Sequence, residues 1–376
     1  MESGELFFPP NSPLSTLHSP LLKKVAVFTI PTGIGAKIGG YAGDASLVAG
    51  KIAEKIPLIV NPNVVNAACF SGITENMLYV EGWAINEFLK GKIALKPSPE
   101  FLDFASGSIR NSTLSQRERG RGNKIGVIFD SAIPQNVLNI HINTINAVKT
   151  VYGIDILDYV VTEEPVGVEF FTDESGLSTG GINNPDTLLK AGQKLKDAGA
   201  QAIAVVCRFD EPENDGYETG NGVDVIGGVE GIISHYLSKN LMLPCVHAPA
   251  FDDVTIGSRV VSPKAAAEYI TPTFLPCLFF GLQNAPQLVS GEWRVESGEW
   301  LENEELGIRN EELITLNNVK ALITPADALG SSAVLDCVNN NIPVFAVEEN
   351  TTVLSVDAQA LGINVTSVST YNDIIL

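Results

Sequence analysis

NPDTLLKAGQKLKDAGAQAIAVVC, residues 184–207, contains a complete helix–strand unit and decides the fold class. Asn184 is a natural N-cap, and Pro185 suits the first position of a helix. Apolar residues then recur at helical spacing as far as Gly199, a residue type that favours the end of a helix. The run Ala202–Cys207 is apolar throughout, as a strand buried on both faces of a parallel sheet must be. This stretch therefore indicates an α/β protein.

Short strands and helices alternate on both sides of this unit. Such alternation is typical of doubly wound sheets, so we predict an α/β fold of two Rossmann-like lobes with mainly parallel sheets and an interlobe cleft. The predicted strands are 25–30, 58–60, 124–129, 154–161, 243–247, 321–324 and 343–347, and the predicted helices are 78–89, 135–151, 229–238, 264–269 and 331–339.

Composition divides the chain into four parts. Residues 1–22 contain four prolines and no apolar period, which predicts an extended arm. Residues 23–91 form a first α/β lobe, and residues 92–123, rich in serine, arginine and glycine, form a polar linker. Residues 124–376 form a second α/β region. In an alternative arrangement, the C-terminal part, residues 316–376, returns to the first lobe.

Charge and cysteine content narrow the partners and the location. The 24 basic and 44 acidic residues give a net charge of −20, which repels nucleic-acid phosphates and anionic lipid. No stretch reaches the ~20 apolar residues of a membrane span, and the N-terminus lacks the pattern of a signal peptide. Five scattered cysteines without CxxC spacing indicate reduced thiols and a cytoplasmic protein. We expect a small-molecule ligand, no nucleic acid and no membrane as partners, and a homo-oligomer is compatible with the sequence.

The loops after the strands are the candidate sites, because ligands of parallel sheets bind beyond the carboxyl ends of the strands. The first loop is PTGIGAKIGGYAGD, residues 31–44, where glycines allow backbone N–H groups to approach a phosphate or carboxylate. Its spacing departs from both the dinucleotide fingerprint and the P-loop, and a tight structural turn is the alternative. The ligand-binding candidates here are Gly33, Gly35, Gly39, Gly40 and Asp44.

The second loop is NPNVVNAACFSGITEN, residues 61–76, which is rich in carboxamides and hydroxyls. Such groups can fix a small polar substrate by hydrogen bonds. Cys69 is a candidate nucleophile or acid–base thiol, although a free cysteine can equally be a small buried hydrophobic residue. The ligand-binding candidates here are Asn61, Asn63, Asn66 and Thr74.

The third and fourth loops begin at CRFD, residues 207–210, and CVHAPAFDD, residues 245–253. Arg208 can bind a substrate carboxylate, or it can form an ion pair with Asp210 or Glu211. The ligand-binding candidates here are Arg208 and Asp210. Cys207 is a candidate thiol, and His247 is a candidate general acid or base. The acidic residues after His247 match no established ligand spacing, so no metal is predicted. We expect at least three of the four loops to line one cleft.

Several segments resemble an uncharacterised family, the domain of unknown function numbered 3326. They are PTGIGAKIGGYAGDA, NPNVVNAACFSG, LYVEGWAINEFLKG, INNPDTLLKAG and PCVHAPAF. The resemblance covers most of the chain from about Val25 onward. It implies a protein of cyanobacteria or plastids, located in the cytoplasm or the plastid stroma, and it supplies no activity.

One segment also resembles the aspartate/glutamate racemase superfamily. The run LLKAGQKLKDAGAQAIAVVC is similar to a helix–strand unit that ends in a catalytic cysteine, which implies that role for Cys207. Racemases of this kind use a second cysteine at another strand end. Here the corresponding strand ends in Pro325 and Ala326, and Cys337 falls inside a predicted helix. The two-thiol mechanism is therefore not matched.

The leading hypothesis is a cofactor-independent enzyme of the isomerase or lyase type. It would act on a small carboxylated or phosphorylated metabolite through cysteine and histidine acid–base groups. One alternative is a non-catalytic metabolite-binding or regulatory protein that uses the same loops. Another is a nucleotide-linked transferase, which requires that the loop of residues 31–44 hold phosphate.

Overall fold

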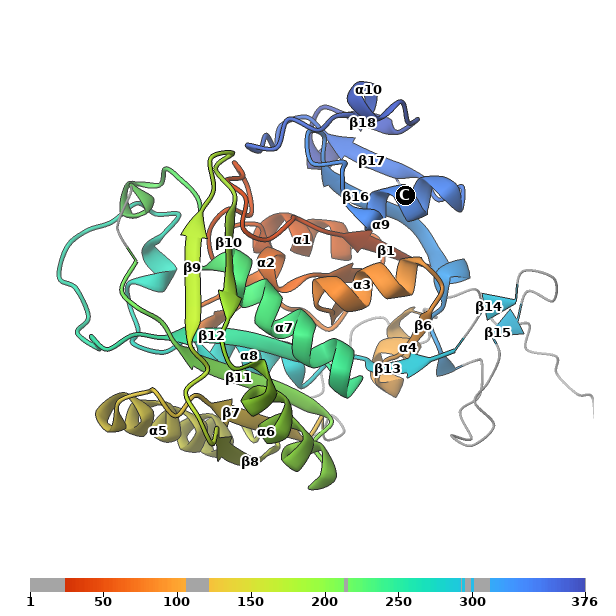
Figure 1. Cartoon of the computed structure of the whole chain (residues 1–376). Helices are drawn as coiled ribbons and strands as arrows, with labels where there is room; N and C mark the ends of the chain where they lie inside the picture. Colours follow the sequence, from red (N-terminus) through yellow and green to blue (C-terminus); the bar gives the residue numbers. More distant parts are fainter. Residues whose placement is uncertain are drawn as a thin grey trace, which may run out of the picture.

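Two parallel β-sheets organise the protein, as seen in the computed structural model (Figure 1). The structure describes residues 24–105, 122–212, 216–291, 293–294, 299–300 and 312–375. The predicted N-terminal arm, residues 1–22, lies outside the described residues. The α/β fold with mainly parallel sheets is confirmed.

The first lobe is built on a six-stranded sheet of order β18-β17-β16-β1-β2-β5 in which all neighbours are parallel. Strand β1 is central and pairs with β16 on one side and β2 on the other, so segments from both ends of the chain share this sheet. The strands are β1 (Val25–Phe28), β2 (Leu58–Val60), β5 (Met77–Tyr79), β16 (Val319–Pro325), β17 (Val344–Val347) and β18 (Thr366–Val368). The helices are α1 (Ser46–Ala53), α2 (Pro62–Val65), α3 (Gly82–Leu89), α9 (Ser332–Asn339) and α10 (Ala358–Leu361).

The second lobe is built on a four-stranded parallel sheet of order β12-β11-β7-β8. The predicted helix–strand unit of residues 184–207 is confirmed, because Pro185 begins helix α6 and strand β11 follows it. Gly199, between the two, has a φ of +96°. The strands are β7 (Ile125–Phe129), β8 (Ile156–Val161), β11 (Ala202–Arg208) and β12 (Cys245–Ala250), and the helices are α5 (Gln135–Tyr152), α6 (Pro185–Asp197), α7 (Gly227–Leu241) and α8 (Leu275–Leu282).

Smaller elements complete the described structure. They are the two-stranded pairs β3 (Asn66–Ala67) with β4 (Phe70–Ser71), β6 (Ile93–Lys96) with β13 (Gln287–Ser290), β9 (Val168–Thr172) with β10 (Ser178–Ile182), and β14 (Trp293–Arg294) with β15 (Glu299–Trp300), together with helix α4 (Pro99–Ala105) and the 3₁₀ helices η1 (Tyr217–Thr219), η2 (Ala266–Glu268), η5 (Leu316–Asn318) and η6 (Tyr371–Asp373).

Four sequence predictions need correction. The predicted helix 78–89 begins later, at Gly82, because its first residues form the edge strand β5. No strand is predicted between residues 163 and 184, but this segment contains the hairpin β9–β10. The predicted helix 264–269 is only the 3₁₀ turn η2. Part of the segment predicted as a polar linker is structured, since β6 and α4 lie within residues 92–123.

The inner strands of both sheets are buried on both faces, as their nearly continuous apolar sequences require, whereas the edge strands β8 and β18 are partly exposed. Along β1, Ala26 and Phe28 face one hydrophobic cluster, and Val25 and Val27 face another that includes α3 and α9. In the second lobe, α6 and α7 cover one face of the sheet, and α5 and α8 cover the other.

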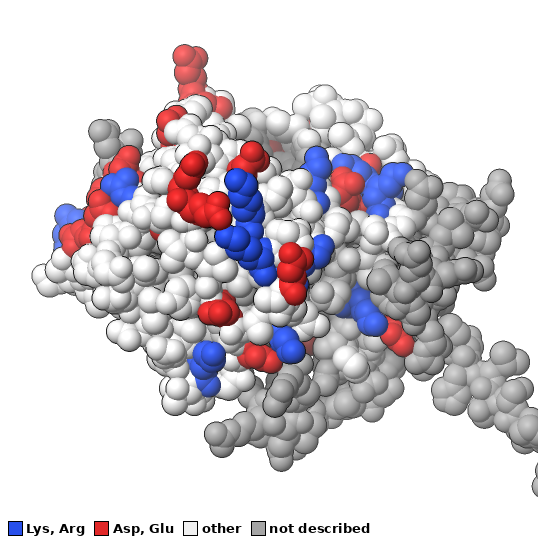
Figure 2. Space-filling model, turned by 60° about the horizontal axis from the view of Figure 1, so that its bottom comes forward, with Lys and Arg blue, Asp and Glu red and all other residues white. Residues whose placement is uncertain are grey.

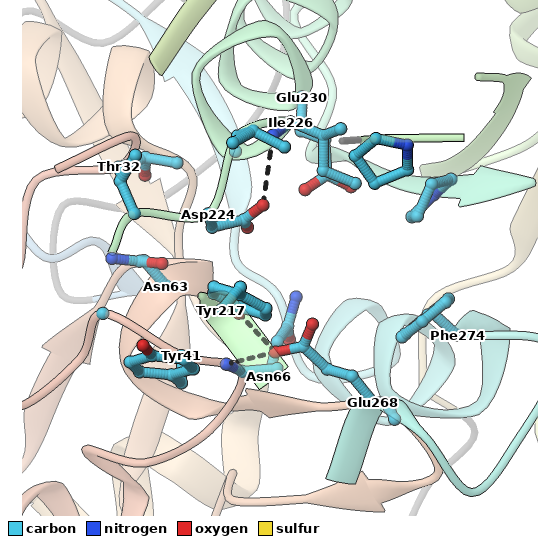
Figure 3. A pocket seen from close by; sticks show the side chains of 18 of the residues that line it. Thr32, Tyr41, Asn63, Asn66, Tyr217, Asp224, Ile226, Glu230, Glu268 and Phe274 are labelled. Atoms are coloured by element: carbon cyan, nitrogen blue, oxygen red, sulfur yellow. Dashed lines mark hydrogen bonds between the residues drawn. The ribbon is translucent and has the colours of Figure 1, made fainter. Parts of the chain in front are cut away.

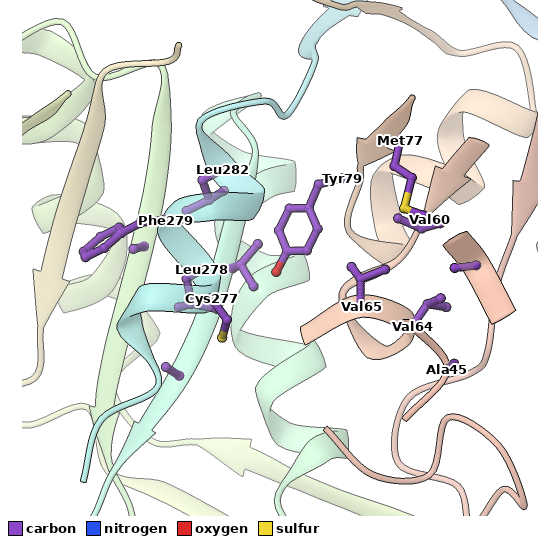
Figure 4. Close-up of a cluster of buried hydrophobic side chains, with 14 of the residues drawn as sticks. Ala45, Val60, Val64, Val65, Met77, Tyr79, Cys277, Leu278, Phe279 and Leu282 are labelled. Carbon is purple, nitrogen blue, oxygen red and sulfur yellow. The ribbon is translucent and has the colours of Figure 1, made fainter. Parts of the chain in front are cut away.

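Helix α8 joins the two lobes. It packs against β11 and β12 of the second sheet and against β3 and β4 of the first lobe. Figure 4 shows the ring of Tyr79, from β5, pointing toward Cys277 and Leu278 of α8. A Cβ at Gly281 would lie only 2.6 Å from the Tyr79 ring, so glycine is required for this close approach. The lobes are therefore held together by tight apolar packing.

Charged side chains of both signs lie on the surface of the protein. On the face shown in Figure 2, acidic side chains lie among the lysine and arginine side chains. Within the described ranges, no helix has the length and apolar character needed to cross a membrane.

Candidate functional site

A cavity of about 1130 Å³ lies between the two lobes. The first lobe contributes the loop after β1, the region around α2 and residues 351–353, and the second contributes the hairpin β9–β10, residues 217–235, the end of β12 and residues 264–278. Three of the four loops predicted to share one cleft line this cavity. The remaining segment, residues 207–210, does not line the cavity.

Three carboxyl groups of the second lobe dominate the cavity wall. Figure 3 shows Asp224 and Glu230 on one side of the open space and Glu268 on the opposite side, with the Glu230 and Glu268 carboxyls turned into it. All three are partly accessible within the cavity. Among the described residues, no lysine or arginine forms an ion pair with any of them. The two lysines that line the cavity, Lys37 and Lys264, therefore do not neutralise these carboxyls by direct contact.

Burial makes these carboxyls unusually weak acids. Burial, reinforced by the charge of Glu230, raises the pKa of Asp224 to about 7. Burial, together with the charge of Asp224, raises the pKa of Glu268 to about 7. The pKa of Glu230 lies well above its usual range, again because of burial first and Glu268 second. Near neutral pH, Asp224 and Glu268 can each either give up or accept a proton.

Glu268 is fixed by two donors from different lobes. Its Oε1 accepts hydrogen bonds from the Tyr217 hydroxyl at 2.6 Å and from the backbone N–H of Ala42 at 3.0 Å. Burial and the neighbouring carboxyls raise the pKa of Tyr217, so its hydroxyl stays protonated and donates. The Tyr217 ring stacks on Tyr41 with centroids 4.5 Å apart, and Lys264 Nζ lies 5.5 Å from the Tyr41 centroid. The contacts among Tyr41, Tyr217 and Glu268 therefore join the two lobes at one side of the cavity.

Glu230 is positioned by His247. The His247 Nε2 accepts a hydrogen bond from the backbone N–H of Cys207 at 3.2 Å, so its Nδ1 carries the proton and donates to Glu230 Oε1 at 3.1 Å. Burial lowers the pKa of His247 to about 3, which keeps the ring neutral. With both nitrogens engaged, His247 orients Glu230 rather than exchanging protons itself.

A second carboxyl–histidine pair lies at another part of the cavity lining. Glu81 caps α3 by accepting hydrogen bonds from two backbone N–H groups, and its Oε2 lies 3.2 Å from His235 Nε2 on α7. Burial raises the pKa of Glu81 to about 7 and lowers the pKa of His235 to about 4. Because α3 and α7 belong to different lobes, this pair also links the lobes.

The structure brings only some of the predicted site residues together. Those that line the cavity are Gly35, Gly40, Asn63, Asn66 and His247. Those that do not line it are Gly33, Gly39, Asp44, Asn61, Cys69, Thr74, Cys207, Arg208 and Asp210.

Several residues outside the cavity have structural partners instead. Arg208 pairs with Asp210 and makes a two-point contact with Asp252, the ion-pair alternative that the sequence left open. Thr74 donates to Asn76. Asp44 accepts a hydrogen bond from Gly39, and burial raises the pKa of Asp44 to about 6.

The cysteines differ in accessibility. Cys207 is fully buried, and this burial raises the pKa of its thiol well above the usual range, so a thiolate there is disfavoured. Cys337 lies buried in α9. Cys69 alone is partly exposed, while the other four are buried.

We expect one thiol per folded chain to react quickly with a thiol reagent, and we expect it to be Cys69. The buried cysteines can react only when the structure around them opens locally. If this opening costs about 3 kcal/mol of free energy, their labelling should be about a hundredfold slower than that of Cys69. Intact-mass spectrometry against time, followed by peptide mapping, gives the order. Rapid labelling of Cys207 in the folded protein would reopen a thiol mechanism.

Five residues that dominate the cavity are not among the predicted site residues: Tyr41, Tyr217, Asp224, Glu230 and Glu268. Two of them, Tyr217 and Asp224, lie in the acidic loop after β11, whose density of carboxyls and glycines was the available signal. Glu230 lies four residues into α7, and Glu268 closes a 3₁₀ turn. Neither position has a sequence pattern that distinguishes it from a solvated acidic residue.

The comparisons identify the family. An "uncharacterized lipoprotein" of Synechococcus sp. is 33% identical over 353 residues, which cover 92% of this chain and 87% of that protein. No solved structure matches the chain. The model of the family described as "Protein of unknown function (DUF3326)" matches residues 25–101 and 103–375. The chain therefore belongs to this family, as its segments predicted.

Proposed function

We propose that the protein is an acid–base enzyme of the isomerase or lyase type that binds a small polar metabolite in the interlobe cavity. The observation that carries the proposal is the pair Asp224 and Glu268, two carboxyls with a pKa of about 7 that face the same cavity. General acid–base catalysis is most effective when the pKa of the catalytic group lies near the working pH. Paired carboxyls in distinct environments can divide the roles of acid and base.

This proposal moves the acid–base chemistry from thiols to carboxyls. Glu268 keeps one oxygen for Tyr217 and Ala42, which leaves the other for a substrate proton. Asp224 is held by the backbone N–H of Ile226 on its Oδ1. The amides of Asn63 and Asn66 on the facing lobe can orient a polar substrate between the two carboxyls.

Several backbone N–H groups of the glycine-rich loop are closed to a phosphate. Its backbone N–H groups at residues 37, 38 and 39 donate to Thr351, Asn350 and Asp44, and that of Ala42 donates to Glu268. These donors are consequently occupied by acceptors of the protein itself. A nucleotide-linked transferase would require them to be free, so we do not propose it.

Solvent deuterium uptake tests the proposed chemistry. Wild-type protein incubated in heavy water with a small-molecule extract of Synechococcus cells should incorporate deuterium into at least one compound, because an acid–base enzyme exchanges substrate protons with its carboxyls. Glu268→Gln should reduce that uptake by about a hundredfold or more, the usual contribution of a general acid or base. Glu54→Gln is the matched control, since Glu54 is exposed at the C-cap of α1 and does not line the cavity. Equal uptake by wild type and Glu268→Gln would overturn the proposal.

The cytoplasmic location stays a prediction from the sequence. The relative from Synechococcus carries the word lipoprotein in its name, which implies attachment to a membrane for that protein. Cell fractionation with an antibody against this chain distinguishes the two, since a cytoplasmic protein remains in the soluble fraction.

A further inference from the structure

We infer that the ligand of the interlobe cavity is a small organic cation carrying at least one ammonium group. This inference rests on the proposed site but not on its catalytic role. It narrows the polar metabolite to one sign of charge. It also departs from the carboxylated or phosphorylated substrate that the sequence indicated.

The charge around the cavity carries the first step. Asp224, Glu230 and Glu268 line it from two sides, and Glu81 adds a fourth carboxyl to the lining. The lysines in the lining, Lys37 and Lys264, are exposed, and Lys264 Nζ is held at the Lys37 carbonyl at 3.1 Å. An anion would meet repulsion from every ionised carboxyl, whereas a cation would compensate their charge.

Tyr41 supplies an independent observation. The residue lines the cavity and is only 3% exposed, and its hydroxyl has no hydrogen-bond partner among the residues that the structure describes. A buried polar group without a partner costs about 1–3 kcal/mol, so a bound molecule is expected to satisfy it. The ring of Tyr41 already stacks on Tyr217, whose hydroxyl is bonded to Glu268. An ammonium N–H can donate to the Tyr41 oxygen once the side chain turns toward the cavity, because the oxygen is closed off from the cavity in this structure.

The spacing of the carboxyls favours an extended organic cation over a metal ion. In the described part of the chain, no three acidic, histidine or cysteine side chains come close enough to coordinate one ion. The carboxyls instead lie on facing walls of a cavity of about 1130 Å³. A molecule with its charge distributed along a short chain can contact both walls at once.

Three four-carbon probes of equal length test the sign of the charge: diaminobutane, butanediol and succinate. Thermal shift and titration calorimetry at about pH 8 would be used, above the pKa of about 7 of Asp224 and Glu268. We expect diaminobutane to bind at least tenfold more tightly than butanediol, and succinate not to bind. Calcium is included as a fourth probe, and stronger stabilisation by calcium than by diaminobutane would overturn the inference in favour of a metal site.

Variants locate the binding. Asp224→Asn and Glu268→Gln, each neutral and close in shape to the wild-type residue, should each weaken diaminobutane binding by about tenfold or more, since a charge contact is worth at least about 1.4 kcal/mol. Tyr41→Phe should weaken it severalfold. Asp158→Asn and Glu54→Gln, both exposed and outside the cavity lining, are the matched controls. Binding that is equal in all these variants, no binding of diaminobutane, or preferred binding of succinate would each contradict the inference.

The two proposals can fail separately. If deuterium enters only a neutral or anionic compound, the acid–base function stands and the ammonium ligand is wrong. If diaminobutane binds through Asp224 and Glu268 but no compound takes up deuterium, the ligand class stands and the protein is a binder.

Discussion

Glu268→Gln is expected to become more stable than the wild-type protein as the pH rises from about 5 to about 8. The pKa of Glu268 is raised from 4.5 to about 7 in the folded protein, first by burial and then by Asp224. Between these two values the folded state binds a proton that the unfolded state has released, so rising pH removes stability from the wild type. Glutamine carries no ionisable proton and escapes this loss. The free-energy difference between the proteins should therefore grow by on the order of 3 kcal/mol.

The difference between the two proteins reports Glu268 together with its interactions with Glu230 and Asp224. The pKa values of His235 and His247 are lowered in the folded protein. These histidines therefore reduce the stability of the protein as the pH falls below about 6.5, whereas Glu268 reduces it as the pH rises. These histidines are present in both proteins, and their contribution cancels. Urea unfolding followed by circular dichroism at several pH values gives the two curves, and Glu54→Gln should run parallel to the wild type. A constant offset between Glu268→Gln and the wild type would show that Glu268 is not a buried, protonated carboxyl.

The layered α/β fold could be predicted because parallel sheets impose a strong pattern on the sequence. Ala202–Cys207 must be apolar at every position when both faces are buried, and Pro185 and Gly199 mark the ends of the preceding helix. Part of β5 falls within the predicted helix 78–89 because Val80, Ala84 and Phe88 recur at helical spacing and the apolar residues of β5 precede them without a break. The hairpin β9–β10 lies outside the predicted strands because β9 is half exposed and β10, STGGI, is rich in glycine and lacks an apolar run.

The candidate site was predicted in outline through its loops but not through its chemistry. The rule that ligands bind beyond the carboxyl ends of strands found Gly40, Asn63 and His247. It could not find Glu268, because the acid strength of a carboxyl depends on burial that only the assembled lobes create. It also could not separate Asn63, which lines the cavity, from Asn61, which lies two residues earlier and does not.

Asn61→Ala is expected to destabilise the protein by about 3 kcal/mol. The Asn61 side chain, 5% exposed, lies where β2 ends and ties it to the end of β1. Its Oδ1 accepts from the backbone N–H of Ile30 at 3.1 Å, and its Nδ2 donates to the Ile30 carbonyl at 2.9 Å. Ile30 itself is fully buried. Alanine would leave the buried N–H of Ile30 without its partner and would leave the Ile30 carbonyl only the longer hydrogen bond from Asn63 Nδ2 at 3.4 Å. A buried polar group without its partner costs about 1–3 kcal/mol.

Chemical denaturation of Asn61→Ala beside Asn143→Ala measures this cost. Asn143 is exposed in the middle of α5, where alanine is the better helix former, so its replacement should change stability by no more than about 0.7 kcal/mol. The same pair separates the two roles of Asn61. If the carboxamide only joins the strand ends, folded Asn61→Ala should bind diaminobutane as the wild type does. If stability is unchanged and binding is lost, Asn61 contacts the ligand, as its position in the loop of residues 61–76 indicated, and the two hydrogen bonds to Ile30 do not hold the strands.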